Sequence, residues 1–396
     1  MVGTMAKIDD SVKKKVPELR FKGFTDDWEE RKLKELFQPS KNKNNNGLYN
    51  QKDILAASLG TELIPKRTFF GLKSTKESVK NYRIVKTGDL IYTKSPIKGF
   101  PNGIIRSNKG NVGIVPPLYC VYTLQKDINS SIIQFYFEDK NRLDFYLFPL
   151  VNVGARNNVN ITDLEFLEGK VTIPKSYEEQ SKIVQFMEQL NRTIALHQRK
   201  LDLLKEQKKG YLQKMFPKNG AKVPELRFAG FADDWEERKF KDILKTHSFR
   251  SYLAGVSENG EYEVIQQGDK PIVGYSDGEP FTDYKDITLF GDHTVSLYKP
   301  KSPFFVATDG VKILSADNFD GDYLYTTLER YKPEPQGYKR HFTILKNQDV
   351  WFTENMEEQQ KIGSFFKQLD DTIALHQRKL DLLKEQKKGF LQKMFV

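Results

Sequence analysis

Apolar residues recur at alternating steps of four and three along two stretches of the chain, residues 183–215 and 362–394. A stripe that repeats every 3.5 residues is typical of a coiled-coil helix, and each stretch would be roughly 50 Å long as a helix. We therefore predict two long helices, residues 178–216 and 357–396, that pack on each other. The predicted helix–helix contact consists of Leu190, Ile194, His197, Leu201 and Leu204 in the first helix and Leu369, Ile373, His376, Leu380 and Leu383 in the second.

The two helical stretches are copies of one sequence. Residues 193–210 (TIALHQRKLDLLKEQKKG) return without a change at 372–389, so the second copy is the natural packing partner of the first. Two polar residues interrupt each apolar stripe, and these are His197 and Lys208 in the first copy and His376 and Lys387 in the second. We interpret them as residues that fix helix register and orientation, with a histidine ligand or switch as the alternative. If the copies pack antiparallel, both histidines fall near a pseudo-two-fold axis.

A second repeat, which we call the strap, precedes each intervening domain. Strap 1 is residues 16–32 (VPELRFKGFTDDWEERK) and strap 2 is residues 223–239 (VPELRFAGFADDWEERK). The proline and the large apolar side chains predict an extended segment that packs on a neighbouring surface. Asp26 and Asp27, just before Trp28, resemble the start of a helix, because carboxylates are favourable at helix N-termini.

The repeats divide the chain into two similar halves that carry dissimilar domains. The predicted order is a polar, basic leader (1–15), strap 1 (16–32), a first domain (33–177), a helix (178–216), a linker with strap 2 (217–239), a second domain (240–356) and a helix (357–396). Candidate elements in the first domain are strands within 83–92 and 113–122 and a helix within 130–146, and the second domain offers 262–265, 292–298, 303–307 and 323–330. The predicted fold class is therefore α/β (α+β), with two mixed domains separated by two long antiparallel helices in a pseudo-two-fold arrangement.

Composition indicates a polyanionic partner. The formal net charge is +10 and the isoelectric point is about 9.2, which favours nucleic acid over a membrane because no amphipathic or lipidation signal accompanies the charge. The single cysteine, Cys120, excludes a disulfide framework and fits a reducing, cytoplasmic compartment. Neither a signal peptide nor an apolar run of about eighteen residues is present, so we expect a soluble chain.

Motifs for catalysis and cofactor binding are absent from the sequence. There is no G-x-G-x-x-G after a strand and no phosphate-binding P-loop, and five scattered histidines with one cysteine predict no metal site. The only Pro-Pro pair follows Val115, which lacks the polar side chain that amino-methyltransferases place there. We therefore expect a protein that is not an enzyme and binds no cofactor itself. Two alternatives are a self-sufficient DNA methyltransferase or nuclease, and a coiled-coil scaffold that binds only proteins.

Both domains instead contain loops rich in lysine, arginine, asparagine and glutamine. Lysine and arginine neutralise phosphates, while arginine, asparagine and glutamine form paired hydrogen bonds with base edges, so these loops are candidate DNA contacts. The candidates in the first domain are Lys41, Lys43, Lys66, Arg67, Lys73, Lys94, Lys98, Arg106, Lys109, Arg156, Asn157 and Asn158. Those in the second domain are Arg250, Gln266, Gln267, Lys270, Lys299, Lys312, Lys339 and Arg340.

The two repeats together resemble a known family. The PELRF-x-GF strap with its tryptophan, the EEQ-x-KI entry to each long helix and the LHQRKLDLLKEQKKG-x-LQKMF helix resemble the DNA-specificity (S) subunits of type I restriction-modification systems. The resemblance covers the whole chain in layout, and the straps and helices in detail.

The resemblance implies a division of labour within a phage-defence complex. Each domain would be a target recognition domain that reads one half of a split DNA site, and the antiparallel helices would act as a spacer. Helices and straps would hold two methyltransferase (M) subunits, which bind S-adenosylmethionine and methylate adenine. Restriction (R) subunits, which use ATP and Mg²⁺, would join that core. Two unlike domains on a rigid spacer predict an asymmetric target with an unread gap.

Overall fold

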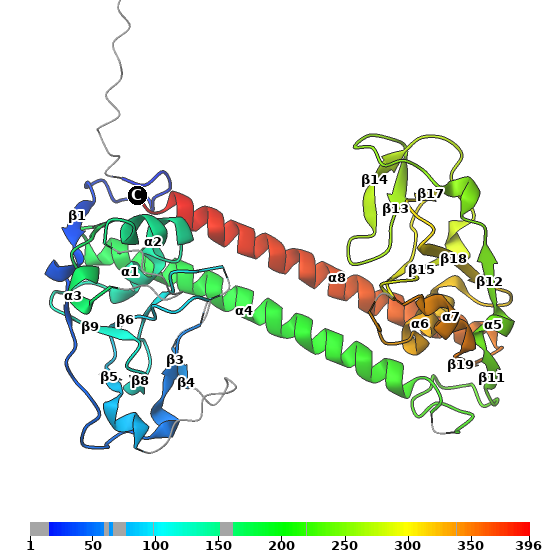
Figure 1. Ribbon diagram of the computed structural model, residues 1–396, viewed down its shortest axis with the longest axis horizontal. Helices are drawn as coiled ribbons and strands as arrows, with labels where there is room; N and C mark the ends of the chain where they lie inside the picture. The colour runs from blue at the N-terminus through cyan, green and yellow to red at the C-terminus, as the bar shows by residue number, and fades with distance from the viewer. Residues whose placement is uncertain are drawn as a thin grey trace, which may run out of the picture. The chain divides into compact units, whose positions relative to one another are not determined.

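The chain forms two compact units in the computed structural model, which describes residues 16–58, 63–65, 77–97, 99–150, 161–218, 220–337 and 339–396. Unit 1 comprises Met1–Gln198 and Lys379–Val396, and unit 2 comprises Arg199–Arg378. Each unit therefore contains one strap, one mixed domain, the start of one long helix and the end of the other (Figure 1). The predicted leader, residues 1–15, lies outside the described residues.

The domain of unit 1 is built on an antiparallel four-stranded sheet. Its strand order is β2 (Phe37–Pro39), β9 (Cys120–Leu124), β6 (Leu90–Tyr92) and β7 (Ile105–Ser107). Smaller pairs are β3 (Leu55–Ala56) with β4 (Ile64–Pro65) and β5 (Arg83–Val85) with β8 (Gly113–Val115). Short helices are η1 (Leu33–Glu35), η2 (Gln51–Asp53), η4 (Ser78–Asn81), α1 (Ser130–Tyr136), α2 (Lys140–Leu147) and α3 (Asp163–Phe166). The ring of Phe166 stacks on Tyr92 and Tyr122, with centroids 4.7 and 5.2 Å away, and so closes the core over the sheet.

The domain of unit 2 has two sheets. The larger is antiparallel, with the order β12 (Leu244–His247), β18 (Val311–Ala316), β15 (Thr288–Gly291) and β16 (Leu297–Tyr298). The smaller has the order β14 (Ile272–Ser276), β13 (Tyr262–Ile265) and β17 (Phe304–Val306), with β13 and β17 parallel. The helical elements are α5 (Phe240–Ile243), η5 (Arg250–Tyr252), η6 (Tyr284–Asp286), α6 (Gly321–Tyr331) and α7 (His341–Asn347). The mixed α+β class predicted for the chain is confirmed.

The two long helices are confirmed as α4 (Tyr177–Lys214) and α8 (Met356–Lys393), each of 38 residues. All ten predicted contact residues are buried or half-buried, whereas Leu196 and Leu375, at other faces of the helices, are 65% and 57% exposed. In unit 1 the ring of Phe186 near the start of α4 meets that of Phe390 near the end of α8, with centroids 4.9 Å apart. Helix starts therefore pack beside helix ends, which makes the pair antiparallel, as predicted.

Each strap ties the start of one long helix to the end of the other within its unit. In unit 1, Arg20 pairs with Glu179 (Nε–Oε1 2.6 Å), and the amide of Leu19 donates to the carbonyl of Lys393 (2.9 Å). In unit 2 the same contacts recur. Arg227 pairs with Glu358 (2.7 Å), and Leu226 donates to Lys214 (2.8 Å). The straps pack on a neighbouring surface, as predicted, but before their final strands they contain bends and a turn at Lys22–Gly23 and Ala229–Gly230 and are not extended throughout. Each strap satisfies a helix-end carbonyl that has no partner inside its own helix.

The predicted helix start at Asp26 and Asp27 is wrong. The residues that follow form strands, β1 (Glu29–Lys32) and β11 (Glu236–Lys239). They pair in the same antiparallel register with β10 (Lys170–Ile173) and β19 (Asp349–Phe352), the last strand of each domain. Pairing with a distant strand satisfies the backbone and overrides the helix propensity of EERK.

No helix in the described ranges combines the length and the apolar character that crossing a membrane requires.

Candidate nucleic-acid interface

A cationic groove lies at the surface of the first domain. It encloses about 740 Å³, and its lining consists of Lys41, Asn42, Lys43, Asn45, Leu48, Tyr49, Ile84, Lys86, Thr87 and Val112. Lys41, Lys43 and Lys86 are exposed, and none forms an ion pair with a residue that the structure describes. Three exposed ammonium groups without an ion pair among the described residues, beside amides and an aromatic ring, match the chemistry of a phosphate backbone with adjacent bases.

One buried amide side chain orders the loop that lines the groove. Asn44 is fully buried, and its Nδ2 donates to the carbonyls of Tyr49 (2.8 Å) and Val79 (3.1 Å), while its Oδ1 accepts from the amide of Tyr49 (3.0 Å). Lys43 also forms an isolated antiparallel bridge with Arg83. The loop that presents Lys41 and Lys43 is therefore ordered by its own neighbours. Sequence analysis missed Lys86; its place just before the Thr87–Gly88 turn is the signal that identifies it as a loop cation.

Three other predicted contacts in the first domain are engaged inside unit 1. Arg106 is 1% exposed, its Nε donates to the carbonyl of Ser58 (2.8 Å), and its Nη1 lies 3.3 Å from Glu138. The prediction that Arg106 contacts DNA is therefore wrong, because a phosphate cannot reach a buried, paired guanidinium. Lys94 donates to the carbonyl of Ile161 (2.6 Å), and Lys109 pairs with Glu188 of α4 (2.6 Å). The predictions for Lys66, Arg67, Lys73, Lys98, Arg156, Asn157 and Asn158 lie outside the described residues.

The predicted cations of the second domain fall into two groups. Arg250, at the start of η5, and Lys270, Lys339 and Arg340, on two separate loops, are exposed. Lys299 and Lys312 are turned inward, because their Nζ atoms donate to the carbonyls of Lys285 (2.6 Å) and Asp309 (2.7 Å). Burial lowers the pKa of Lys299, although nearby carboxylates oppose that shift.

The two predicted glutamines of this domain hold turns in place. Gln266 Nε2 donates to the carbonyl of Lys270 (3.2 Å), and Gln267 Oε1 accepts from the amide of His293 (2.9 Å). Both side chains are half-buried. Their hydrogen bonds favour a role in shaping the 266–270 turn that presents Lys270, rather than a direct contact with a base.

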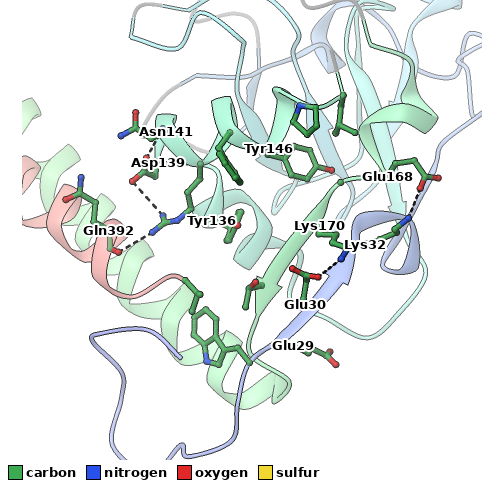
Figure 2. Close-up of a pocket in the computed structure, with 18 of the residues that line it drawn as sticks. Glu29, Glu30, Lys32, Tyr136, Asp139, Asn141, Tyr146, Glu168, Lys170 and Gln392 are labelled. Atoms are coloured by element: carbon green, nitrogen blue, oxygen red, sulfur yellow. Dashed lines mark hydrogen bonds and ion pairs between the residues drawn. The ribbon is translucent and has the colours of Figure 1, made fainter. Parts of the chain in front are cut away.

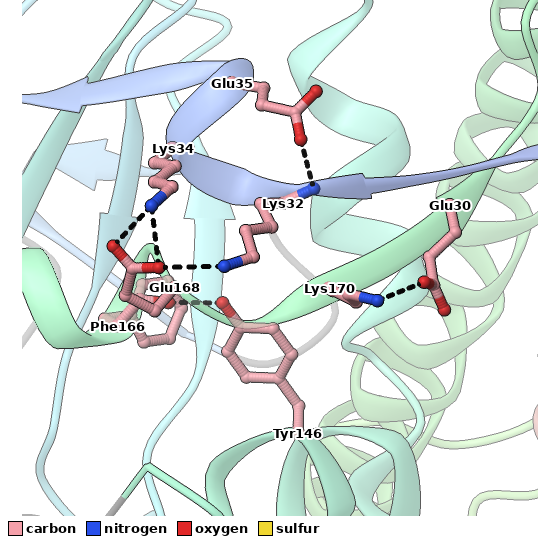
Figure 3. A network of polar contacts seen from close by, with 8 residues as sticks. All are labelled: Glu30, Lys32, Lys34, Glu35, Tyr146, Phe166, Glu168 and Lys170. Carbon is pink, nitrogen blue, oxygen red and sulfur yellow. Dashed lines mark hydrogen bonds and ion pairs between the residues drawn. The ribbon is translucent and has the colours of Figure 1, made fainter.

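A larger hollow in unit 1, of about 1380 Å³, has a different character. It lies beside strap 1 and α2, and Figure 2 shows its lining residues. Most of its cations are matched by acids. Lys170 pairs with Glu30 (2.6 Å), and Glu168 accepts from both Lys32 (3.2 Å) and Lys34 (2.8 Å), as Figure 3 shows. A surface whose charges neutralise each other offers little attraction to a polyanion, so the smaller groove is the better candidate.

Metal and thiol chemistry find no support in the described part of the chain. No group of three or more His, Cys, Asp and Glu residues there has the geometry to hold a metal ion. His341 is fully buried, with Nδ1 3.0 Å from the carbonyl of Asp292 and Nε2 accepting from the amide of Gln336 (2.8 Å). Burial raises the pKa of the Cys120 thiol to about 11, which leaves it unreactive at neutral pH.

Comparisons with known proteins agree with this architecture. A family model described as the type I restriction modification DNA specificity domain matches residues 25–206 and again residues 232–385. A putative type I restriction enzyme MjaX specificity subunit from Methanocaldococcus jannaschii is 22% identical over an alignment of 414 positions that covers 92% of each chain. The crystal structure of a type I restriction-modification system S subunit from M. genitalium has the same fold, with a TM-score of 0.65 at 14% identity over 96% of this chain and 99% of that one. Because the two family matches span well over half of its residues, the chain belongs to the family of type I restriction-modification DNA specificity domains and carries two copies of that domain.

Proposed function

We propose that this chain is the DNA-specificity subunit of a type I restriction-modification complex, and that each domain reads one half of an asymmetric, bipartite target. The observation that carries this proposal is that the straps and long helices are repeated, whereas the two domains that they hold differ in sequence and in their smaller sheets. The strap salt bridges Arg20–Glu179 and Arg227–Glu358 have the same bidentate geometry. The four-stranded sheets of the two domains share one strand order (first, last, second and third along the chain). Apart from the strap pairs β1–β10 and β11–β19, the remaining strands form two two-stranded pairs in the first domain and one three-stranded sheet in the second. Repeated straps and helices that hold two different domains suit a protein that binds two different DNA sequences with the same overall geometry.

The exposed cations support the DNA contact. In the first domain they gather at the Lys41–Lys43–Lys86 groove, and in the second they include Arg250 and Lys270. Contacts with phosphates bring affinity and position the domain, while the amides beside them supply hydrogen bonds for bases. This distribution argues against a scaffold that binds only proteins.

The long helices are proposed to bind two M subunits. Leu196 of α4 and Leu375 of α8 occupy equivalent positions of the identical repeat, and they are 65% and 57% exposed. Leu203 and Leu382 form a second equivalent pair, 51% and 59% exposed. Matched apolar side chains on two identical segments suit two identical partners. In this proposal the M subunits supply S-adenosylmethionine and adenine methylation, and R subunits supply ATP- and Mg²⁺-dependent chemistry.

The test is co-expression of this chain with its cognate M subunit, followed by genome-wide mapping of methylated adenines. One split motif with unlike halves and a constant gap is the expected result. Exchanging residues 33–177 for another domain of the family should change one half of that motif only. A stable complex that methylates no split motif would contradict the bipartite proposal, and methylation by this chain alone would make it an enzyme.

The M-subunit surface is tested separately by Leu196→Glu combined with Leu375→Glu. The matched control is Ala195→Glu with Ala374→Glu, which adds the same charges at exposed neighbouring positions. We expect the leucine variant to lose co-purification with the M subunit and the alanine variant to retain it. Equal retention by both variants would exclude these leucines from the contact.

A further inference from the structure

In each domain one short helix, α1 in unit 1 and α6 in unit 2, begins beside the long helices. Both helices begin after an N-cap residue that the same repeat position binds. Gln180 Oε1 accepts from the amide of Asn129 (2.9 Å), and its equivalent Gln359 accepts from the amide of Asp320 (2.8 Å). The side chains of Asn129 and Asp320 in turn accept from the first-turn amides of α1 and α6. One glutamine thus locates the start of each domain helix.

A lysine of the identical repeat pairs with a glutamate near the far end of each domain helix, two residues beyond the end of α1 in unit 1 and within the last turn of α6 in unit 2. Lys387 Nζ lies 2.6 Å from Glu138, and its equivalent Lys208 lies 2.5 Å from Glu329. Glu138 follows Asn129 by nine residues, and Glu329 follows Asp320 by the same interval. The two domains have no comparable sequence identity, but both contain an Asn or Asp helix cap followed nine residues later by a glutamate. The cap binds the glutamine and the glutamate binds the lysine of the long helices.

Other contact positions differ between the two helix copies, and the differences match the domain that each copy holds. Position 188 is glutamate and pairs with Lys109 of the first domain (2.6 Å). Its equivalent, Lys367, pairs with Asp322 of the second domain (2.9 Å). The sign of the charge is therefore reversed on both sides of the contact.

A second difference concerns how closely the helices approach. Gly363 of α8 lies against the start of α6, where an added Cβ would be 2.7 Å from the amide nitrogen of Tyr323 and 2.8 Å from Oδ1 of Asp320. The equivalent residue of α4 is Val184, which is 4% exposed in the core of unit 1. Helix α6 therefore needs a glycine at this position, whereas unit 1 has a valine packed there.

We propose that the long helices form two docking sites for the domains. Both sites recognise the same helix feature, but each accepts only its own domain. Docking site 1 is Gln180, Val184, Glu188 and Lys387, and docking site 2 is Gln359, Gly363, Lys367 and Lys208. The glutamine and lysine accept any domain helix with the cap and the glutamate nine residues apart. Positions 184/363 and 188/367 restrict each site to its own domain. At site 1 the second domain would bring Asp322 towards Glu188 and the α6 backbone against Val184, so repulsion and steric overlap would prevent docking.

A domain graft in the full chain tests this proposal without DNA or M subunits, so its outcome is independent of the proposed function. Residues 33–177 are replaced by a second copy of residues 240–356, and limited proteolysis with fragment masses reports each position separately. We expect the grafted copy to be cleaved at least about tenfold faster than the resident copy, because an undocked domain opens more often. Adding Val184→Gly and Glu188→Lys should bring the two cleavage rates to within about twofold.

Both remaining outcomes contradict the proposal. Protection of the graft without the two substitutions would mean that the sites do not discriminate, and persistent cleavage with them would mean that these positions do not decide docking. The native chain offers a second test through hydrogen exchange of α1. Glu188→Lys should raise exchange roughly fivefold, and adding Lys109→Glu should restore it to within about twofold, because charge-paired neighbours are coupled. A double variant that exchanges faster than the single one would refute the charge contact.

Discussion

Replacing Glu179 by glutamine removes the charge that anchors strap 1 to helix α4, and it should destabilise unit 1 selectively. The carboxylate is 2% exposed and accepts from Arg20 Nε (2.6 Å), Arg20 Nη2 (2.9 Å) and Trp28 Nε1 (3.3 Å). Glutamine keeps the shape and one acceptor oxygen, so the change isolates the charge. The equivalent substitution, Glu358→Gln, provides a matched comparison in unit 2, where the carboxylate is fully buried and pairs with Arg227 in the same way.

The expected loss follows from what Arg20 retains. Breaking a buried ion pair by removing one partner costs about 3–5 kcal/mol, because the remaining charge stays unpaired. The Arg20 side chain is 14% exposed and still donates to the carbonyl of Asp26 (2.7 Å), which places the expected loss near the lower end, about 3 kcal/mol. Trp235 Nε1 has no hydrogen-bond partner within the described ranges, unlike Trp28. Glu358→Gln should therefore cost about 1 kcal/mol less than Glu179→Gln.

Hydrogen exchange of the amides in β1 and in the second turn of α4 measures the free energy of opening unit 1 locally, which suits a chain with two separate units. An apolar pair, Arg20→Leu with Glu179→Leu, should recover most of the loss, since it removes both charges together. A change below about 1 kcal/mol in Glu179→Gln would place this salt bridge among weak surface pairs and refute the reasoning. The reasoning would also be refuted if the double variant Arg20→Leu with Glu179→Leu were as unstable as Glu179→Gln.

Three further predictions concern charge and burial. Lys43→Ala with Lys86→Ala should reduce the slope of log affinity for DNA against log salt by about 1.8, as measured by titration at several salt concentrations, and an unchanged slope would exclude the groove from DNA contact. Burial by itself would raise the pKa of Glu138, but Arg106 and Lys387 hold that pKa below its ordinary value, so unit 1 should lose stability as the pH falls below about 4.3. Asp370 of α8 pairs with Lys208 (2.6 Å), and burial raises the pKa of Asp370, so its contribution to the stability of unit 2 should rise as the pH falls through the same acid range. Hydrogen exchange of α1 and α6 across pH distinguishes the two trends, and parallel trends would contradict them. Cys120, 1% exposed, should react with thiol reagents only when the first domain opens, and rapid labelling of the native chain would be inconsistent with its burial.

The docking contacts illustrate why part of the fold could not be predicted. Gln180 and Asn129 are 51 residues apart, and Gln359 and Asp320 are 39 apart, so no fixed sequence interval relates the two pairs. The common interval of nine residues lies inside each domain, from the N-cap of α1 or α6 to the later glutamate. Its significance is visible only when the contacts of both domains with the long helices are compared. Likewise, Lys208 and Lys387 were interpreted as residues that set helix register, and the structure shows that both also bind a glutamate of the adjacent domain.

The sequence by itself determined the repeat of straps and long helices, because each of its signals is local. The 3.5-residue stripe through Leu201 and Leu380 identifies two long helices without reference to any other segment, and exact repetition identifies their partnership. Tertiary structure alone decided which loop cations are available. Arg106 and Lys41 belong to the same chemical class, but Arg106 is enclosed by Glu138 while Lys41 meets solvent. Burial depends on the path of the whole chain, and a pattern within one loop carries no information about what covers it.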